Sequence, residues 1–433
     1  VRSSAASDVY KRQDVACSIT YADRKYKRSR HKDIWTQSLG WMRTFNLTIG
    51  VREPDRWNAP TTKRALEQLL GWLTEDAWHL TFALQPNPVR RRSDAQSTLP
   101  FRATPGRVVL FSGGLDSLAG VSALVQEDRD TPLYLMSAVS PRMDMPEKIA
   151  SRIRAVYPQV EFAAFPFHLV HTDRHDQRAD DASQRSRGFL FFAFAAAVAA
   201  TTGSNNIISC ENGIGAINLP MNWLQLGTQN TRAMHPRTLV EMQVFLELLG
   251  LPHLRLELPF LWKTKGEVCS VLAETPLRDL TRLTVSCDNF PDRTVPRPAP
   301  DVEVHCGECT SCMLRRLAVA NAGLKEPDVP TVRYKVDLCL PMVGSETSHH
   351  EHLKYMLDQV ATLREAIAPN AVAGMLLREF PELTDVAAAV ITYPNQFAFS
   401  SQPDQEDLFR RLSGLYRRYA AEWENLPYSL AFR

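Results

Sequence analysis

Short apolar segments alternate with helical ones through the middle of the chain. The apolar segments RVVLF, LYLMSAV, EFAAFPF and NIISC begin at residues 107, 133, 161 and 206. Continuous apolar runs of this length are typical of parallel strands that are buried on both faces. Because helical segments separate the runs, the pattern predicts an α/β core in which helices cover both faces of a doubly wound parallel sheet.

The pattern changes on either side of this core. The segments FNLTIGV (45–51) and WHLTFAL (78–84) alternate in the manner of half-buried strands, and a helical stripe of leucines lies between them. The last helical segment places these residues on one apolar stripe: Leu408, Phe409, Leu412, Tyr416, Tyr419 and Trp423. We therefore predict an α+β domain at 14–104, the α/β core at 105–325 and a helical region at 326–433.

Composition narrows the class of protein. The 433 residues carry a formal net charge of +2, which gives no overall attraction to nucleic acid. The longest apolar run, 189–200, is shorter than the roughly 20 residues that a bilayer requires, so it predicts a buried core helix. We expect a cytoplasmic protein that contacts no membrane and binds no nucleic acid directly. The segment 1–13 precedes the first methionine, Met42, and we expect it to be a leader foreign to the native protein.

The segment VVLFSGGLDSLAG (108–120) places a glycine-rich turn between a strand and a helix. The first N–H groups of a helix are unpaired and attract anions, and glycine lets the backbone approach a ligand closely. The turn lacks the Gly-Lys-Ser/Thr of a Walker A loop and matches neither GxGxxG nor GxSxG. We therefore predict a phosphate-binding turn, whose candidate residues are Ser112, Gly113, Gly114, Asp116 and Ser117.

Four of the eight cysteines lie close together in the sequence. Cys287, Cys306, Cys309 and Cys312 have the spacing C-x18-C-x2-C-x2-C. Four thiolates can close a tetrahedral zinc site, which leaves no open position for catalysis and predicts a structural role. The alternatives are an iron–sulfur cluster or a disulfide pair, and a cytoplasmic location disfavours the disulfide.

Together, SGGLDS and HCGECTSCMLRR resemble the 7-cyano-7-deazaguanine synthases, a family of ATP pyrophosphatases, over residues 105–325. The resemblance implies the PP-loop fold of adenine nucleotide α hydrolases, with ATP, Mg²⁺ and Zn²⁺ as cofactors. It also implies adenylation of 7-carboxy-7-deazaguanine, with the turn residues on the ATP phosphates and the four cysteines on zinc.

Further candidates fit such a site. Arg187 begins the apolar helix, where a cation opposes the helix dipole unless an anion lies between them, so we predict that it binds a phosphate or carboxylate. Glu211 and Asn212 follow the strand NIISC at its carboxyl end, where open α/β sheets bind ligands, and we predict substrate contacts there. The segment FLWKTKGEV resembles the family's Lys-x-Glu region and implicates Lys265 and Glu267, although an ordinary capped helix start explains it equally. Arg232 is a weaker substrate-binding candidate.

The segments that flank the core are larger than those of an ordinary synthase. In this respect the chain resembles the enlarged synthase-like proteins of bacterial anti-phage operons, the Qat and type IV CBASS systems. That resemblance implies transfer of the activated acyl group to the N-terminal amine of a co-encoded partner protein. Two alternatives stay open: a housekeeping synthase that uses ammonia, and a non-catalytic scaffold that binds ATP and zinc.

Overall fold

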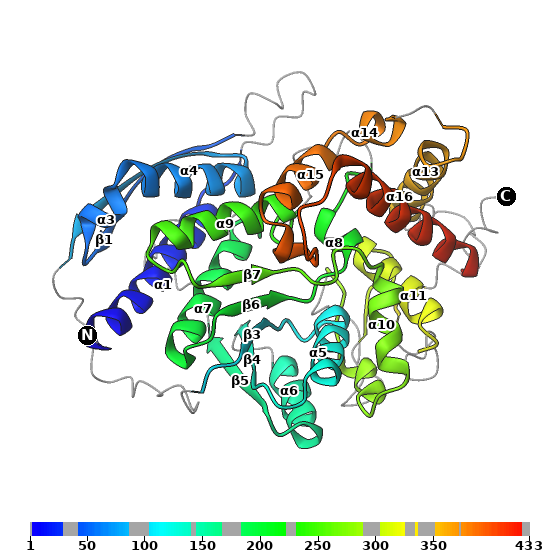
Figure 1. The fold of residues 1–433 in the computed structure, drawn as a ribbon, viewed down its shortest axis with the longest axis horizontal. Coiled ribbons are helices and arrows are strands. Elements are labelled where there is room, and N and C mark those ends of the chain that lie inside the picture. The colour runs from blue at the N-terminus through cyan, green and yellow to red at the C-terminus, as the bar shows by residue number, and fades with distance from the viewer. Residues whose placement is uncertain are drawn as a thin grey trace.

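The computed structural model has a five-stranded parallel sheet at its centre (Figure 1). It describes residues 2–28, 42–85, 104–139, 144–166, 183–221, 231–288, 304–324, 334–336, 351–371 and 374–426. The strands are β3 (Arg107–Leu110), β4 (Leu133–Val139), β5 (Val160–Pro166), β6 (Asn206–Ser209) and β7 (Arg255–Glu257). Their order across the sheet is β5-β4-β3-β6-β7, and every neighbouring pair is parallel.

Helices cover both faces of this sheet, as the apolar runs predict. Along β3, Val108 and Leu110 belong to one hydrophobic cluster, while Val109 between them belongs to the other. Helix α7 (Arg187–Thr202) packs on the first face, and α5 (Leu115–Glu127), α6 (Met145–Val156) and α10 (Lys265–Ala273) lie on the second (Figure 1). The predicted α/β class is therefore confirmed, and the apolar run 189–200 is a buried helix.

The strand order fixes where a ligand site is expected. From β3 the chain proceeds outward through β4 to β5, and it then returns to the other side of β3 to add β6 and β7. The order of connection reverses between β3 and β6, and open α/β sheets bind ligands beyond the carboxyl ends of the strands at such a point.

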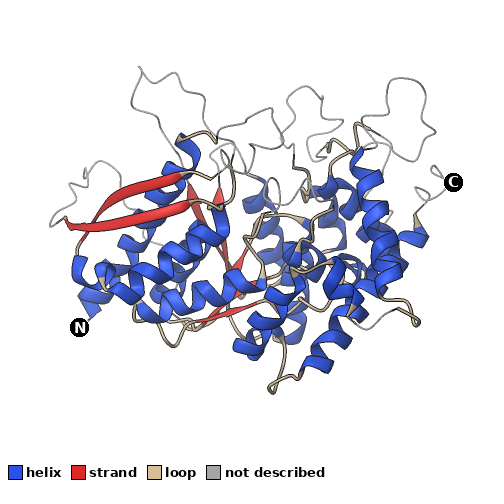
Figure 2. Ribbon diagram, turned by 90° about the horizontal axis from the view of Figure 1, so that it is seen from above, coloured by secondary structure: helices blue, strands red, loops and turns tan. Residues whose placement is uncertain are grey.

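The N-terminal unit forms a second, two-stranded sheet (Figure 2). Strands β1 (Thr44–Val51) and β2 (Ala77–Leu84) are parallel, and the connection between them contains α3 (Pro54–Asn58) and α4 (Pro60–Thr74). Trp78, Leu80 and Phe82 are buried as the alternation predicts, but Leu84 at the end of the strand is largely exposed. Side chains of Glu67 and Asn58 accept hydrogen bonds from the N–H groups of Leu80 and Phe82 on β2.

The sequence pattern did not reveal helix α1 (Arg2–Lys25). It packs against α7 of the core, and it continues without a break across the boundary that we placed between residues 13 and 14. Its buried residues Val15, Ala16, Ile19 and Ala22 join the same hydrophobic cluster as α7 and the N-terminal sheet. The N-terminal unit and the core therefore share one hydrophobic cluster.

The remaining elements are helical. They are α8 (Gly213–Ile217), α9 (Pro236–Leu248), η2 (Arg278–Leu283), α11 (Thr310–Asn321), α13 (Glu351–Ala366), α14 (Met375–Glu379), α15 (Leu383–Thr392), η4 (Pro394–Phe397), α16 (Gln405–Glu422) and η5 (Trp423–Asn425). Helix α16 buries the predicted stripe except for Phe409, which is exposed; Leu415 is buried as well, and Trp423, the last residue of the stripe, is buried in η5. Across the described ranges, no helix has the combination of length and hydropathy that a membrane crossing demands.

Candidate functional site

The glycine-rich turn connects β3 to α5. Gly113 has a φ of +74°, a backbone conformation that residues other than glycine rarely adopt. Gly114 is the N-cap of α5 and offers no side chain to its first turn. The Ser112 hydroxyl accepts a hydrogen bond from Gly114 N at 3.2 Å, and the Ser117 hydroxyl donates one to Gly114 O at 2.8 Å. The turn thus combines two hydroxyl groups with the positive end of a 13-residue helix.

A pocket of about 210 Å³ opens beside this turn. Its walls include the carboxyl ends of β3, β4 and β6, so it lies at the reversal point of the sheet. The predicted site residues among its lining are Ser112, Asp116, Ser117, Arg187 and Glu211. Its apolar wall is formed by Phe111, Met136, Ala138, Phe191 and Met234, among others. The pocket therefore offers both anion-binding groups and apolar surfaces.

Asp116 is the centre of a polar cluster at the pocket. Lys265, the first residue of α10, forms an ion pair with Asp116 Oδ2. Asn212, the N-cap of α8, donates from Nδ2 to Asp116 Oδ1 at 2.9 Å and to Glu211 Oε1 at 3.0 Å. Four predicted residues from three separate segments of the sequence are thus brought together.

Electrostatics determine the charge of this cluster. Burial and the nearby carboxylate of Asp116 raise the pKa of Glu211 to about 8. Burial by itself would lower the pKa of Lys265, but the carboxylates of Asp116 and Glu211 outweigh it and raise that pKa. The cluster therefore combines a charged Lys265 with a Glu211 carboxyl group whose raised pKa favours the protonated form, which can donate a hydrogen bond to a ligand.

Two predicted residues lie elsewhere. Glu267 accepts a hydrogen bond from Thr264 N at 2.8 Å in a capping box at the start of α10, and Arg418 pairs with it at 2.7 Å. Arg232 stacks on the ring of Trp72 at 4.2 Å and pairs with Glu75 at 2.8 Å. Both side chains have structural partners that explain their presence, and neither lines the pocket.

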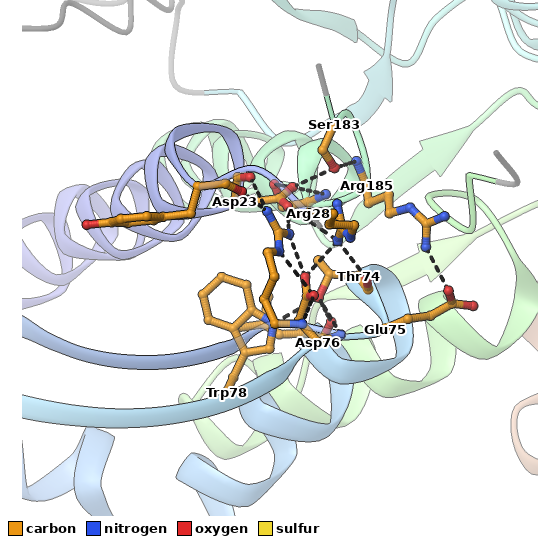
Figure 3. Close-up of polar contacts among 12 residues, drawn as sticks. Asp23, Arg28, Thr74, Glu75, Asp76, Trp78, Ser183 and Arg185 are labelled. Carbon is orange, nitrogen blue, oxygen red and sulfur yellow. Dashed lines mark hydrogen bonds and ion pairs between the residues drawn. The ribbon is translucent and has the colours of Figure 1, made fainter. Parts of the chain in front are cut away.

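Arg187 lines the pocket, but the anion at the start of α7 belongs to the protein itself. Asp23 of α1 accepts hydrogen bonds from Ser186 N at 3.3 Å and from Ser186 Oγ at 2.8 Å, at the N-cap of α7 (Figure 3). Arg185 pairs with Glu75 at 3.0 Å. The helix therefore needs no bound anion. Arg187 stays a ligand-binding candidate only because its side chain lines the pocket.

Asp23 also belongs to a buried network of four charged residues that the sequence did not reveal (Figure 3). Arg43 Nη2 lies 2.5 Å from both Asp23 Oδ1 and Asp76 Oδ2, and Arg28 Nη2 lies 2.7 Å from Asp76 Oδ2. The four side chains are at most 9% exposed. No regular spacing links these residues, so a local pattern could not have identified them. The network joins α1, the N-terminal sheet and the start of α7.

The four predicted cysteines form a candidate metal centre. Their Sγ atoms all lie within 4.8 Å of one another, and those of Cys306 and Cys312 are 3.8 Å apart. Tetrahedral zinc with Zn–S bonds of about 2.3 Å requires sulfur atoms about 3.8 Å apart, whereas a disulfide requires about 2.05 Å. All four cysteines are free of disulfides, so the cluster fits a metal ion such as zinc.

The backbone holds the cysteines in place from several directions. Cys312 lies in α11, Cys309 is its N-cap, and Cys287 follows η2. Gly307 has a φ of +88° in the turn between Cys306 and Cys309. Backbone hydrogen bonds from Lys335 N to His305 O and from Val336 N to Cys306 O tie this turn to residues 334–336.

Glu422 of α16 is a buried acid beside the start of α10. The Thr264 hydroxyl, at the N-cap next to Lys265, donates a hydrogen bond to Glu422 Oε1. Burial raises the pKa of Glu422 to about 7. In the unfolded chain this pKa returns to about 4.3, so between the two values the folded protein binds more protons than the unfolded chain. The contribution of Glu422 to stability is therefore lost as the pH rises through this window.

Replacing Glu422 by Gln should flatten this pH dependence. When the pH is raised from about 5 to about 8, the unfolding free energy of the wild-type protein should fall. We expect this fall to be up to about 3 kcal/mol larger than the fall in Glu422→Gln. Urea unfolding of both proteins at the two pH values measures the difference. Glu424→Gln is the control, because the Glu424 side chain is 70% exposed. Equal pH dependence in the wild type and Glu422→Gln would contradict the assignment.

Comparison of the sequence with models of protein families and with curated proteins finds no match.

Proposed function

We propose that this protein is an ATP-dependent carbon–nitrogen ligase that adenylates 7-carboxy-7-deazaguanine and transfers the acyl group to an amine. The observation that carries the proposal is the pocket where the SGGLDS turn meets the Asp116–Lys265 pair and Glu211. The proposed fold is the PP-loop fold of adenine nucleotide α hydrolases, in keeping with the parallel sheet and the position of the turn after β3.

The chemistry assigns a task to each part of the pocket. In the first step a substrate carboxylate oxygen attacks the α-phosphorus of ATP, and the bond to pyrophosphate breaks. The turn amides, Ser112 and Ser117 would hold the phosphates, while Arg187 and Lys265 offset their charge. Magnesium, which Asp116 is suited to hold, would neutralise the leaving pyrophosphate. Phe191 and Met234 would pack against a flat heterocycle, and Glu211 would form hydrogen bonds with it, while Asn212, which is buried behind the pocket wall, would hold Glu211 in place.

In the second step an amine nitrogen attacks the acyl carbon, AMP leaves, and the amine loses one proton. We propose that the amine is the N-terminus of a co-encoded partner protein in bacterial anti-phage defence. An α-amino group has a pKa of about 7.7–8.0, so a larger fraction of it is neutral and nucleophilic than of lysine, whose pKa is about 10.4. The N-terminal unit and the helices α13–α16 supply additional surface that a small-molecule synthase does not need.

Intact-protein mass spectrometry tests this proposal. The neighbouring gene product, incubated with this protein, ATP and 7-carboxy-7-deazaguanine, should gain the mass of one deazaguanine acyl group. Blocking the partner's N-terminus should abolish the gain, because the attacking amine is then absent. Free nitrile formed from ammonia, with no partner modified, would instead support the housekeeping synthase, and absence of AMP would support the non-catalytic scaffold.

A further inference from the structure

Arg315 is the largest side chain that is fully buried within the described residues. It lies in α11, three residues after the cysteine-cluster residue Cys312. Its guanidinium donates from Nη1 to Thr284 Oγ1 at 2.7 Å and to Thr284 O at 3.3 Å, and from Nη2 to Thr281 O at 2.8 Å. A further contact of 3.4 Å joins Nη1 to Ser286 Oγ. One side chain of the metal-centre helix thus holds the segment that leads to Cys287.

This segment lies directly against the glycine-rich turn. A Cβ atom built on Gly114 would be only 3.2 Å from the carbonyl oxygen of Val285. Val285 lies between Thr284 and Ser286, the two residues that Arg315 contacts, and it packs on the same hydrophobic cluster as α5. Arg315 therefore holds the backbone just before the residue that contacts the turn and also reaches the side chain just after it.

From this arrangement we infer that Arg315 is a positioning residue that couples the four-cysteine metal centre to the glycine-rich turn. A metal ion on the four cysteines would hold Cys312 in the first turn of α11 and Cys287 at the end of the segment, while Arg315 holds the backbone between them near Gly114. The coupling does not depend on what the pocket binds; only its effect on ATP affinity rests on the proposed function.

The guanidinium suits this position because it presents several N–H donors in a fixed plane. Lysine keeps the charge but cannot reach two carbonyl groups and a hydroxyl group with the same geometry. Arg315→Lys therefore removes the positioning while it keeps a buried cation. Arg364 in α13 offers a control, because it also donates to a backbone carbonyl group, that of Ala420 at 2.8 Å, but contacts neither the cysteine cluster nor the glycine-rich turn in the described contacts.

Hydrogen exchange of the full-length, zinc-loaded protein tests the coupling without any ligand. In Arg315→Lys we expect the amides of residues 118–121, which form the first hydrogen-bonded turn of α5, to exchange at least about tenfold faster than in the wild type, with zinc content unchanged. Arg364→Lys should leave their exchange unchanged. Removing zinc from the wild type with a chelator should accelerate the same amides. Wild-type exchange in an Arg315→Lys protein that retains one zinc per chain would overturn the inference.

Thr284→Val provides a second, milder variant in case Arg315→Lys does not fold. It removes the hydroxyl acceptor and leaves the carbonyl groups, so faster exchange of residues 118–121 is again expected, and an unchanged rate counts against the coupling. ATP titration of the same proteins separates the two proposals. If ATP binds, Arg315→Lys should weaken its affinity about tenfold. If the wild type binds no ATP while the exchange rates differ as expected, the proposed function fails and the coupling stands.

Discussion

Replacing Asp116 by alanine is expected to reduce the conversion of ATP to AMP and pyrophosphate by about a hundred- to a thousandfold. Asp116 pairs with Lys265 and accepts a hydrogen bond from Asn212, so its loss releases both side chains from their positions at the pocket. Ser117→Ala should act in the same direction, because the Ser117 hydroxyl lines the pocket at the start of α5. AMP release with 7-carboxy-7-deazaguanine as substrate measures both effects.

Asp128→Asn is the matched control for these variants. Asp128 is the C-cap of α5, at the opposite end of the helix from the turn, and it accepts hydrogen bonds from the backbone of Asp130 and Thr131. We expect Asp128→Asn to retain wild-type AMP formation. AMP formation that is undiminished in both Asp116→Ala and Ser117→Ala would exclude the glycine-rich turn from the reaction.

Cys309→Ser is expected to lose the metal and much of the stability of the core. Structural zinc binds such sites with about 10–16 kcal/mol, and this binding energy acts as folding energy. A typical domain has only about 5–15 kcal/mol of total stability, so loss of the metal should unfold the region around η2 and α11. Metal analysis should give one zinc per wild-type chain and none in the variant, and thermal unfolding should show a lower midpoint.

Cys17→Ser serves as the control, since Cys17 lies half-buried in α1 and outside the cluster. This variant should retain one zinc per chain. Zinc that persists in Cys309→Ser would contradict the four-cysteine site. Iron together with inorganic sulfide in the wild type would identify a different metal centre and would favour thiolation chemistry.

The features that could be predicted from sequence are those encoded by neighbouring residues. The apolar runs predicted strands β3 to β6, because strands buried on both faces need continuous apolar sequence. The SGGLDS turn and the closely spaced cysteines are likewise local. Residues 264–267 (TKGE) show the limit of this approach. These four residues form a capping box at the start of α10. Within them Lys265 pairs with Asp116 beside the pocket, whereas Glu267 pairs with Arg418.

Contacts between distant segments were not predictable in this way. Asp116 and Lys265 are 149 residues apart, and their pairing depends on how α5 and α10 pack. Arg232 shows the same limit, because its contacts with Trp72 and Glu75, more than 150 positions earlier in the chain, cannot be read from the residues around it. Charged residues carry no periodic signal when their partners lie on other elements, so the Asp23 network could be found only in three dimensions.

The Asp23 network sets a lower limit on when α1 can pack during synthesis of the chain. Asp23 completes its hydrogen bonds only when Ser186 is available, 163 residues later in the chain. At about 5–20 residues per second, ribosomes need roughly 8 to 30 seconds to make that length. Throughout this interval the apolar face of α1 has no α7 to pack against. Helix α1 can therefore reach its packed position only after α7 has been made, and the nascent chain must stay soluble until then.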